Sequence, residues 1–258
     1  MMFSTLISLS SFGAAELLRH GQSWCTALAA EAGADSVEVR GELLRDAARE
    51  LPELRGRAAV YSSPEGLWRA DGTLDTEALA LGLSRADALA APRLKMAIGG
   101  FDAGRSRGSL AELRARLQAQ SAVELLIEND QTVRAGTLSA MQRFVAAQAD
   151  AGLQLGLTFD MGNWHWLGEC PLQAARALAP HVRYVHAKGV FRRPDKWVAV
   201  PLAQSSAPWR AVLRELPADV PHAIEYPLVG DDLLAVTRAE LAQLRALHAE
   251  RSLAHDLA

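Results

Sequence analysis

Eight short segments rich in β-branched and aliphatic residues recur along the chain at a nearly constant spacing. From Leu6 in the first segment to Ala223 in the last, the chain advances 217 residues in seven steps, an average of 31 residues per step. One strand followed by one helix has this length, and strands that alternate with helical stretches indicate a parallel sheet. The eight expected strands cover residues 3–8, 36–40, 58–62, 93–98, 123–129, 153–160, 182–188 and 222–226.

The stretches between these strands have the composition and spacing of amphipathic helices. Leu and Ala recur at intervals of three and four residues, with Arg and Glu between them, a pattern typical of a helix that buries one face. Two acidic residues open the last stretch, where they suit the positive end of the helix dipole. The best-defined helices are expected over residues 14–32, 110–120, 137–149 and 231–248, and the longest loops over residues 99–108 and 189–207.

Eight strand–helix units without a Pro-, Gly- or Ser-rich linker predict an α/β fold in which residues 1–258 form a single domain. We expect a (β/α)8 TIM barrel, that is, a closed parallel sheet of eight strands surrounded by helices. An open, doubly wound sheet is the alternative. No GxGxxG motif follows the first strand and no GxxxxGK(S/T) motif occurs, which disfavours a nucleotide-binding open sheet.

The composition favours a globular protein without a broad basic surface. Half of the residues are hydrophobic and 22% are charged, enough to build a sizeable core. Lys and Arg total 27 against 30 Asp and Glu, a formal charge of −3, so we expect no nucleic-acid partner. No apolar stretch approaches the ~18 residues of a membrane span, and Cys25 and Cys170 form no CxxC motif. We expect a cytoplasmic protein without membrane contact; the oligomeric state is left open, a homo-oligomer included.

Four consecutive strands each end in a residue of a type that binds metal ions. Side chains alternate between the barrel interior and the helix layer, and active sites of such barrels lie at the C-terminal ends of the strands. Unpaired burial of a charge costs several kcal/mol, and one divalent cation (Mn²⁺, Mg²⁺, Co²⁺, Fe²⁺ or Zn²⁺) would satisfy all four groups. The expected ligands are Glu128, Asp160, His186 and Glu225, and the expected outward-facing neighbours are Ile127, Phe159, Val185 and Ile224.

These residue types suit reactions that move a proton on a carbon next to a carbonyl group. A chelated cation would stabilise the cis-enediolate that forms, and Glu128 and Glu225 are candidates for the acid/base pair. Lys188 is expected to bind a substrate oxygen or to support a ligand. Glu38 either contacts substrate or joins an ion pair at the barrel mouth, and Lys95 is interpreted as structural. Taken singly, each ligand candidate also has a structural explanation, such as an ion pair between Glu225 and Lys188.

The motifs at the four strand ends resemble those of the xylose-isomerase-like barrel superfamily, which includes sugar isomerases, sugar 3-epimerases and AP endonucleases. The resemblance rests on Glu128-Asn129, Asp160-Met-Gly-Asn163, Val185-His186-Ala-Lys188 and Ile224-Glu225, with ligand spacings of 32, 26 and 39 residues. It is strong in the second half of the chain and only a strand rhythm in the first. It implies a Glu–Asp–His–Glu metal site in which both glutamates also act as the acid/base pair.

The chain departs from the epimerase pattern after the sixth strand. The epimerases carry DxxH there, whereas this chain has Asn163 in the place of the histidine, and its nearest histidine is His165. We therefore expect Asn163 or His165 near the substrate. The resemblance also implies a substrate-binding arginine at Arg192, six residues after His186, with Arg193 as the alternative. The missing histidine weighs against an AP endonuclease, where it helps to hold further metals.

The sequence as a whole predicts a metal-dependent isomerase or epimerase of a sugar or sugar phosphate, an enzyme of carbohydrate metabolism. Three alternatives stay open. The first is a metal-dependent dehydratase or other lyase of the same fold. The second is a DNA-repair enzyme similar to AP endonucleases. The third is a barrel that binds a small ligand without catalysis.

Overall fold

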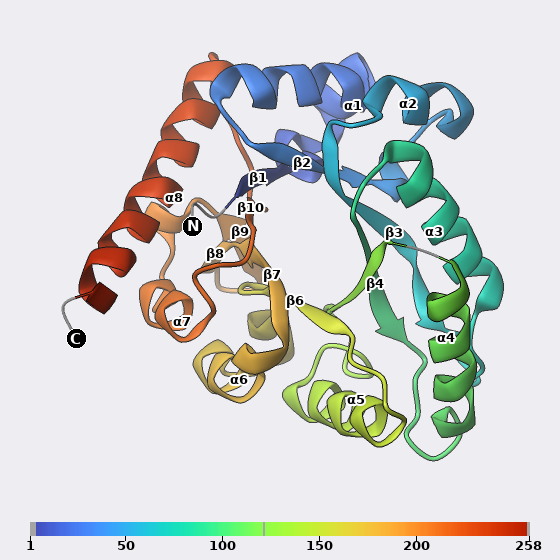
Figure 1. The fold of residues 1–258 in the computed structure, drawn as a ribbon. Coiled ribbons are helices and arrows are strands. Elements are labelled where there is room, and N and C mark those ends of the chain that lie inside the picture. The colour runs from blue at the N-terminus through green and yellow to red at the C-terminus, as the bar shows by residue number, and fades with distance from the viewer. Residues whose placement is uncertain (1–3, 121, 257–258) are drawn as a thin grey trace.

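The barrel sheet is closed and wholly parallel. The computed structural model describes residues 4–120 and 122–256, so the expected first strand residue, Phe3, lies outside the described residues. The strand order around the barrel is β1-β10-β7-β6-β5-β4-β3-β2, with β1 paired to both β10 and β2 (Figure 1). The strands are β1 (Thr5–Ser8), β2 (Ser36–Arg40), β3 (Ala58–Trp68), β4 (Arg93–Gly99), β5 (Glu124–Glu128), β6 (Gly156–Asp160), β7 (Val182–Ala187) and β10 (His222–Ile224). The predicted (β/α)8 barrel is confirmed.

Helices follow the barrel strands and surround the sheet (Figure 1). The Thr137 hydroxyl accepts a hydrogen bond from the backbone N–H of Ala140 and so caps the start of α5. Asp232, one of the two acidic residues expected to open the last helix, accepts one from Ala235 N at 2.9 Å. The α-helices are α1 (Gly13–Ala32), α2 (Ala47–Leu54), α3 (Thr76–Leu89), α4 (Arg107–Gln120), α5 (Leu138–Asp150), α6 (Pro171–Leu178), α7 (Trp209–Glu215) and α8 (Leu233–Asp256). Short 3₁₀ turns are η1 (Leu9–Phe12), η2 (Gly41–Leu43), η3 (Asn163–Leu167), η4 (Ala179–His181) and η5 (Leu202–Gln204).

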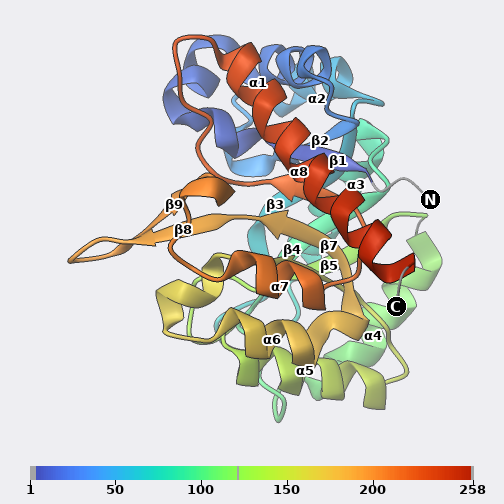
Figure 2. The ribbon, with the colours of Figure 1, turned by 90° about the vertical axis from the view of Figure 1, so that its left-hand side faces the viewer.

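The segment expected to be a loop over residues 189–207 instead contains a β-hairpin. Strands β8 (Gly189–Arg192) and β9 (Trp197–Val200) pair in antiparallel fashion, with Arg192 opposite Trp197. The hairpin projects from the barrel on the side of the strand C-termini (Figure 2). The prediction failed because each strand has only four residues and an apolar side chain, Phe191, is exposed. The hairpin sequence therefore lacks the alternation of apolar and polar residues that indicates a half-buried strand.

The barrel interior and the helix layer hold separate apolar clusters. Ile127, Phe159, Val185 and Ile224 belong to the large cluster between sheet and helices, as expected. Inside the barrel, a small layer fills the end near the strand N-termini and supports the polar residues beyond it. It consists of Leu6, Val60, Leu126, Tyr184 and Ala223.

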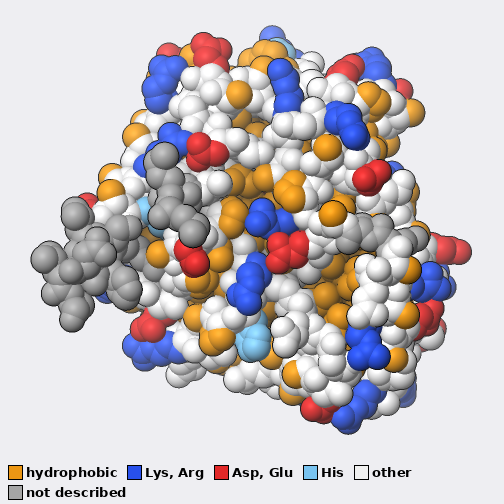
Figure 3. Space-filling model, in the orientation of Figure 1, with side chains coloured by type: hydrophobic (Ala, Val, Ile, Leu, Met, Phe, Trp, Pro, Cys, Tyr) orange, Lys and Arg blue, Asp and Glu red, His pale blue; other side chains and the backbone are white. Residues whose placement is uncertain are grey.

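The described residues carry mixed charges on the face that contains the N-terminal ends of the strands. Basic and acidic side chains are intermingled there with apolar ones (Figure 3), in keeping with the small net charge of −3. No described helix combines the length and apolar character that a membrane crossing requires.

Candidate metal centre

The four expected ligands meet inside the barrel, at the ends of β5, β6, β7 and just beyond β10. His186 lies at the centre of the cluster: its Nδ1 is 2.8 Å from Glu225 Oε2, 2.9 Å from Glu128 Oε1 and 3.6 Å from Asp160 Oδ2. The candidate ligand atoms of all four residues lie within 4.8 Å of one another. The side chains of Asp160 and His186 are fully buried, whereas those of Glu128 and Glu225 are 16% and 11% exposed. Only the two glutamates therefore reach the barrel mouth.

The backbone around Asp160 is held by a clamp from the neighbouring strand. Asn129, which follows β5, accepts a hydrogen bond from Asp160 N at 2.8 Å and donates one to Asp160 O at 3.1 Å. Asp160 Oδ1 accepts from the N–H groups of Gly162 and Asn163 at 2.7 and 3.0 Å. Its other oxygen, Oδ2, is thereby turned toward the cluster. A side chain at Gly162 would place Cβ 2.5 Å from Lys188 Cδ, so the close approach of Lys188 requires glycine there.

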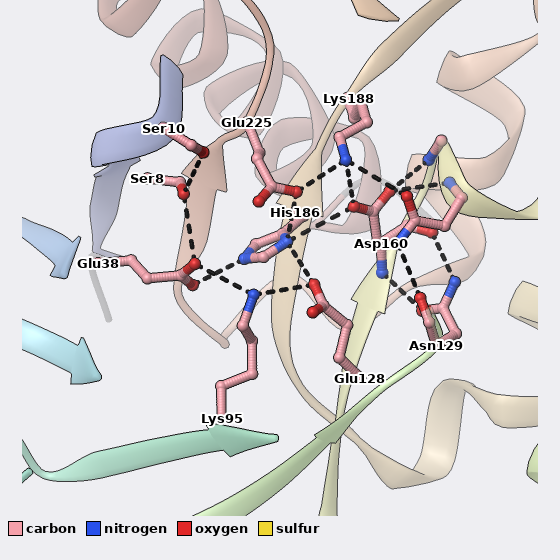
Figure 4. Close-up of polar contacts among 12 residues, drawn as sticks. Ser8, Ser10, Glu38, Lys95, Glu128, Asn129, Asp160, His186, Lys188 and Glu225 are labelled. Atoms are coloured by element: carbon pink, nitrogen blue, oxygen red, sulfur yellow. Dashed lines mark hydrogen bonds and ion pairs between the residues drawn. The ribbon is translucent and has the colours of Figure 1, made fainter. Parts of the chain in front are cut away.

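Three cationic side chains surround the carboxylates, and Figure 4 shows two of them, Lys95 and Lys188. Lys188 Nζ lies 2.6 Å from Asp160 Oδ2 and 2.8 Å from Glu225 Oε2, so the ion pair with Lys188 that was the alternative explanation for Glu225 is present. Lys95, 1% exposed, bridges Glu128 Oε1 at 2.9 Å and Glu38 Oε1 at 3.1 Å. Arg40 Nη1 lies 2.6 Å from Glu225 Oε1.

These contacts shift the ionisation of the cluster. Burial by itself would raise the pKa of Glu225, but His186 and Lys188 hold that pKa well below its ordinary value. Burial also opposes the shift at Glu128, whose pKa Lys95 and His186 nevertheless lower. Burial would lower the pKa of His186, yet Glu225 and the other carboxylates raise it well above its ordinary value. Both glutamates are therefore ionised at neutral pH and have the charge that a ligand or a base requires.

Glu38 occupies a different position from the barrel-mouth site that the sequence suggested. Its side chain is fully buried, and its Oε2 lies 2.8 Å from His186 Nε2. Lys95 and His186 lower the pKa of Glu38 against the opposing effect of burial. The ion-pair interpretation of Glu38 agrees with these contacts, whereas its complete burial leaves no surface for substrate.

The remaining expected substrate residues fall into two groups. Asn163 is 6% exposed and belongs to the network of the cluster: its Oδ1 accepts from Gln131 Nε2 at 3.0 Å and lies 3.4 Å from Lys188 Nζ. His165 and Arg192 lie together at the hairpin, where both contact the ring of Trp197, with His165 4.7 Å from the Trp197 ring centroid and Arg192 5.5 Å from it. Arg193, on the same hairpin, is exposed.

Several residues of the site carried no functional signal in the sequence. Asn129 was noticed only as part of a motif, and Gln131 was given no site role. Lys95 was interpreted as structural, although it contacts one expected ligand directly. The usable signal for Lys95 was its position: it stands at an inward-facing place in β4, in register with inward-facing Leu126, where an aliphatic residue would be ordinary.

The cluster fits a divalent metal ion by its donor set and by one orphaned atom. His186 Nδ1 is buried and makes no hydrogen bond of normal geometry with any described residue, although three carboxylate oxygens face it. One imidazole nitrogen and three carboxylate oxygens suit the divalent ions of the first transition series. They also suit Mg²⁺, although Mg²⁺ prefers oxygen ligands to an imidazole nitrogen.

No protein-family model matches the chain, and no curated protein matches it. Solved structures are similar to it. L-ribulose 3-epimerase matches with a TM-score of 0.71 and 18% identity over 99% of this chain and 98% of that chain. The probable 3-DHS dehydratase AsbF, involved in petrobactin synthesis, from Bacillus anthracis matches with a TM-score of 0.66 and 17% identity over 94% and 98%.

IOLI protein, solved with a binding zinc atom, matches with a TM-score of 0.64 and 11% identity over 96% of this chain and 98% of that chain. Structural similarity at identities this low shows a shared fold and does not show a shared activity. A further match over 100% of both chains is a xylose isomerase domain containing protein from Salmonella typhimurium, with a TM-score of 0.64 and 15% identity. The chain therefore has the fold of the xylose-isomerase-like TIM barrels, as its strand-end motifs predicted.

Proposed function

We propose that this chain is a divalent-metal-dependent isomerase or epimerase of a sugar or sugar phosphate. The observation that carries the proposal is the placement of two partly exposed glutamates, Glu128 and Glu225, on two sides of His186 Nδ1 (Figure 4). Glu128, Asp160, His186 and Glu225 would hold the ion. When bound, such an ion polarises the carbonyl and adjacent hydroxyl of a substrate and makes the neighbouring C–H more acidic.

The residues of the chain would then move the proton. Glu128 Oε1 is turned toward Lys95 and His186, so its second oxygen is the one available to a substrate. Glu225, on the other side of the cluster, would return the proton to the opposite face in an epimerisation. Lys188 lies between the cluster and Asn163, where its ammonium would bind a substrate oxygen once an ion competes for Asp160 and Glu225.

A dehydratase is the second candidate, because the two glutamates are not equivalent. Both oxygens of Glu225 lie close to cations, Oε1 2.6 Å from Arg40 Nη1 and Oε2 2.8 Å from Lys188 Nζ. Glu128 contacts the ammonium of Lys95 through only one oxygen, Oε1. Elimination of water on one face of the substrate needs a base that takes the proton from carbon and an acid that gives a proton to the departing hydroxyl, and Glu128 alone would serve as both in turn. The similarity to a probable dehydratase is compatible with this candidate.

Metal content is the first test. Purified protein is analysed for bound metals, next to Glu128→Gln and the matched control Glu124→Gln, which changes an exposed residue at the other end of the same strand. We expect wild type and the control to bind about one equivalent of a divalent ion and Glu128→Gln to lose it. Equal metal content in all three proteins would contradict the ligand role of Glu128.

Deuterium incorporation then separates the reactions. Metal-loaded protein is incubated in deuterated water with a panel of free and phosphorylated ketoses and with 3-hydroxy keto acids. Deuterium at C3 of a ketose indicates epimerisation, and deuterium at C1 or C2 indicates isomerisation. Loss of water with a new conjugated double bond indicates the dehydratase. A metal-loaded protein that changes none of these substrates but binds one of them favours a ligand-binding barrel and refutes the enzyme proposal.

A further inference from the structure

Glu38 is a buried carboxylate whose two oxygens contact different partners. Oε1 faces Lys95 Nζ at 3.1 Å, Arg40 Nη1 at 3.2 Å and the Ser8 hydroxyl at 3.3 Å. Oε2 faces His186 Nε2 at 2.8 Å. Glu38 stands on the opposite side of the imidazole from Asp160 (Figure 4), so the ring separates it from the candidate ligand cluster.

The chemistry of imidazole gives this contact a specific consequence. A neutral histidine carries its proton on one ring nitrogen and binds a metal through the other. Because an ionised carboxylate only accepts hydrogen bonds, Glu38 Oε2 at 2.8 Å requires the proton to be on Nε2. When the ring is neutral, as metal binding requires, Nδ1, which faces Glu128, Asp160 and Glu225, is then the nitrogen with the free lone pair.

We propose that Glu38 is a positioning residue of the metal centre: it fixes the tautomer and the ring orientation of His186 so that Nδ1 is presented to the ion. The inference rests on the metal centre of the proposed function. Tyr184 supports the ring from a second direction, with the two rings edge to face and their centroids 5.1 Å apart. Through Lys95, which also contacts Glu128 Oε1 at 2.9 Å, Glu38 is linked to a second ligand candidate.

The position of Glu38 distinguishes this role from substrate contact. Its side chain is fully buried, and the His186 ring lies between it and Glu225, with Nε2 2.8 Å from Glu38 Oε2 and Nδ1 2.8 Å from Glu225 Oε2. Partners that orient a metal-binding histidine through its second ring nitrogen typically change metal affinity by about 10–100-fold when they are removed. A residue that contacts only substrate would leave the affinity for the ion unchanged.

The test measures binding of Zn²⁺ alone, by isothermal titration calorimetry without any substrate. Variants are Glu38→Ala and Glu38→Gln, and the matched control is Glu42→Gln, which removes another carboxylate that contacts Arg40, at 2.8 Å. We expect Glu38→Ala to weaken binding about 10–100-fold. Glu38→Gln retains an accepting oxygen and should lose less, while the control should stay within about twofold of wild type.

A second measurement locates the ring proton of His186 directly in the folded, zinc-loaded protein. Long-range ¹H–¹⁵N spectra of histidine-labelled, zinc-loaded protein report which ring nitrogen carries the proton. We expect His186, assigned by its loss in His186→Asn, to carry a slowly exchanging proton on Nε2. In zinc-loaded Glu38→Gln this proton should exchange faster, whereas the Glu42→Gln spectrum should match that of wild type.

The outcomes separate the two proposals. Zinc binding by wild type with the same affinity in Glu38→Ala, or a wild-type His186 that carries its proton on Nδ1, would overturn the positioning role and leave the metal centre standing. A wild type that binds no zinc, manganese or cobalt would overturn the metal-dependent function, and the inference with it. Weaker binding in both Glu38 variants together with the expected Nε2 proton supports both.

Discussion

Replacement of Lys95 by methionine tests how the barrel accommodates its buried charges. The Lys95 ammonium is 1% exposed and lies 2.9 Å from Glu128 Oε1 and 3.1 Å from Glu38 Oε1. Burial by itself would lower the pKa of Lys95, but Glu128 and Glu38 raise it, so the side chain is charged in the folded protein. Methionine fills a similar volume with an apolar chain, so Lys95→Met removes the charge with little loss of packing.

The expected loss of stability follows from the partners that stay behind. Removal of one member of a buried ion pair destabilises a protein by about 3–5 kcal/mol, because the other charge stays buried without compensation. Here Glu38 keeps its contacts with Arg40 and His186, and Glu128 keeps its contact with His186. We therefore expect the lower end, about 3 kcal/mol, a large share of the roughly 5–15 kcal/mol that stabilises a typical domain.

The assay is urea unfolding at pH 7 in the presence of a chelator, followed by fluorescence of the six tryptophans. The control is Arg93→Met, two residues earlier on β4. Arg93 Nε lies 3.1 Å from Glu124 Oε2, and the two side chains are 25% and 41% exposed, so the control should lose less than about 1 kcal/mol. Equal losses in both variants, at unchanged m-values, would refute the conclusion that Lys95 compensates buried charge.

The pH dependence of the same comparison has a defined sign. Against the effect of burial, Lys95 lowers the pKa of Glu128 in the folded protein. Its contribution is therefore present above the unfolded pKa of a glutamate, about 4.3, and is lost as the pH falls through the lower folded pKa. The difference in unfolding free energy between wild type and Lys95→Met should be largest near pH 7 and shrink below about pH 4. A difference that grows on acidification would contradict this account.

Three further predictions concern other parts of the chain. At pH 8, iodoacetamide should alkylate exposed Cys170 and spare buried Cys25, whose pKa burial raises to about 12; peptide mass mapping of folded protein checks this, and modified Cys25 would contradict it. Asn129→Ala removes two hydrogen bonds to the Asp160 backbone and should cost about 2 kcal/mol in urea unfolding and weaken zinc binding. Thr137→Ala removes the cap of α5 and should lower the free energy of unfolding by about 1 kcal/mol while zinc affinity stays unchanged. A lower zinc affinity in Thr137→Ala would show that the weaker zinc binding of Asn129→Ala is not specific to the hydrogen bonds between Asn129 and Asp160.

The barrel was predictable because its signal is repeated. Eight similar units reinforce one another, and an error of a few residues at one boundary leaves the spacing intact: β3 runs on to Trp68 and β6 begins only at Gly156, yet the closed sheet is the expected one. The hairpin over β8 and β9 was missed because it occurs once and is half-exposed.

The candidate ligands were predictable for a related reason. Glu128, Asp160, His186 and Glu225 occupy equivalent places at the ends of consecutive strands, and alternation along a strand decides which of two directions each side chain takes. No such rule connects Glu38 with His186. They are 148 residues apart and come from β2 and β7, which are not neighbours in the sheet, so their contact depends on the width of the closed barrel and on the side-chain length.

The ion pairs around the cluster correct one expectation from the sequence. From the sequence, we expected the convergent acidic groups to need an external cation, because each unpaired buried charge costs several kcal/mol. The barrel itself supplies cations, and the pKa of His186 is raised so that its ring also favours the charged form. Burial alone therefore does not demand a metal; the case for one rests on His186 Nδ1 and the three carboxylate oxygens that face it. The carboxylates are Glu38, Glu128, Asp160 and Glu225, and the cations that contact them are Arg40, Lys95 and Lys188.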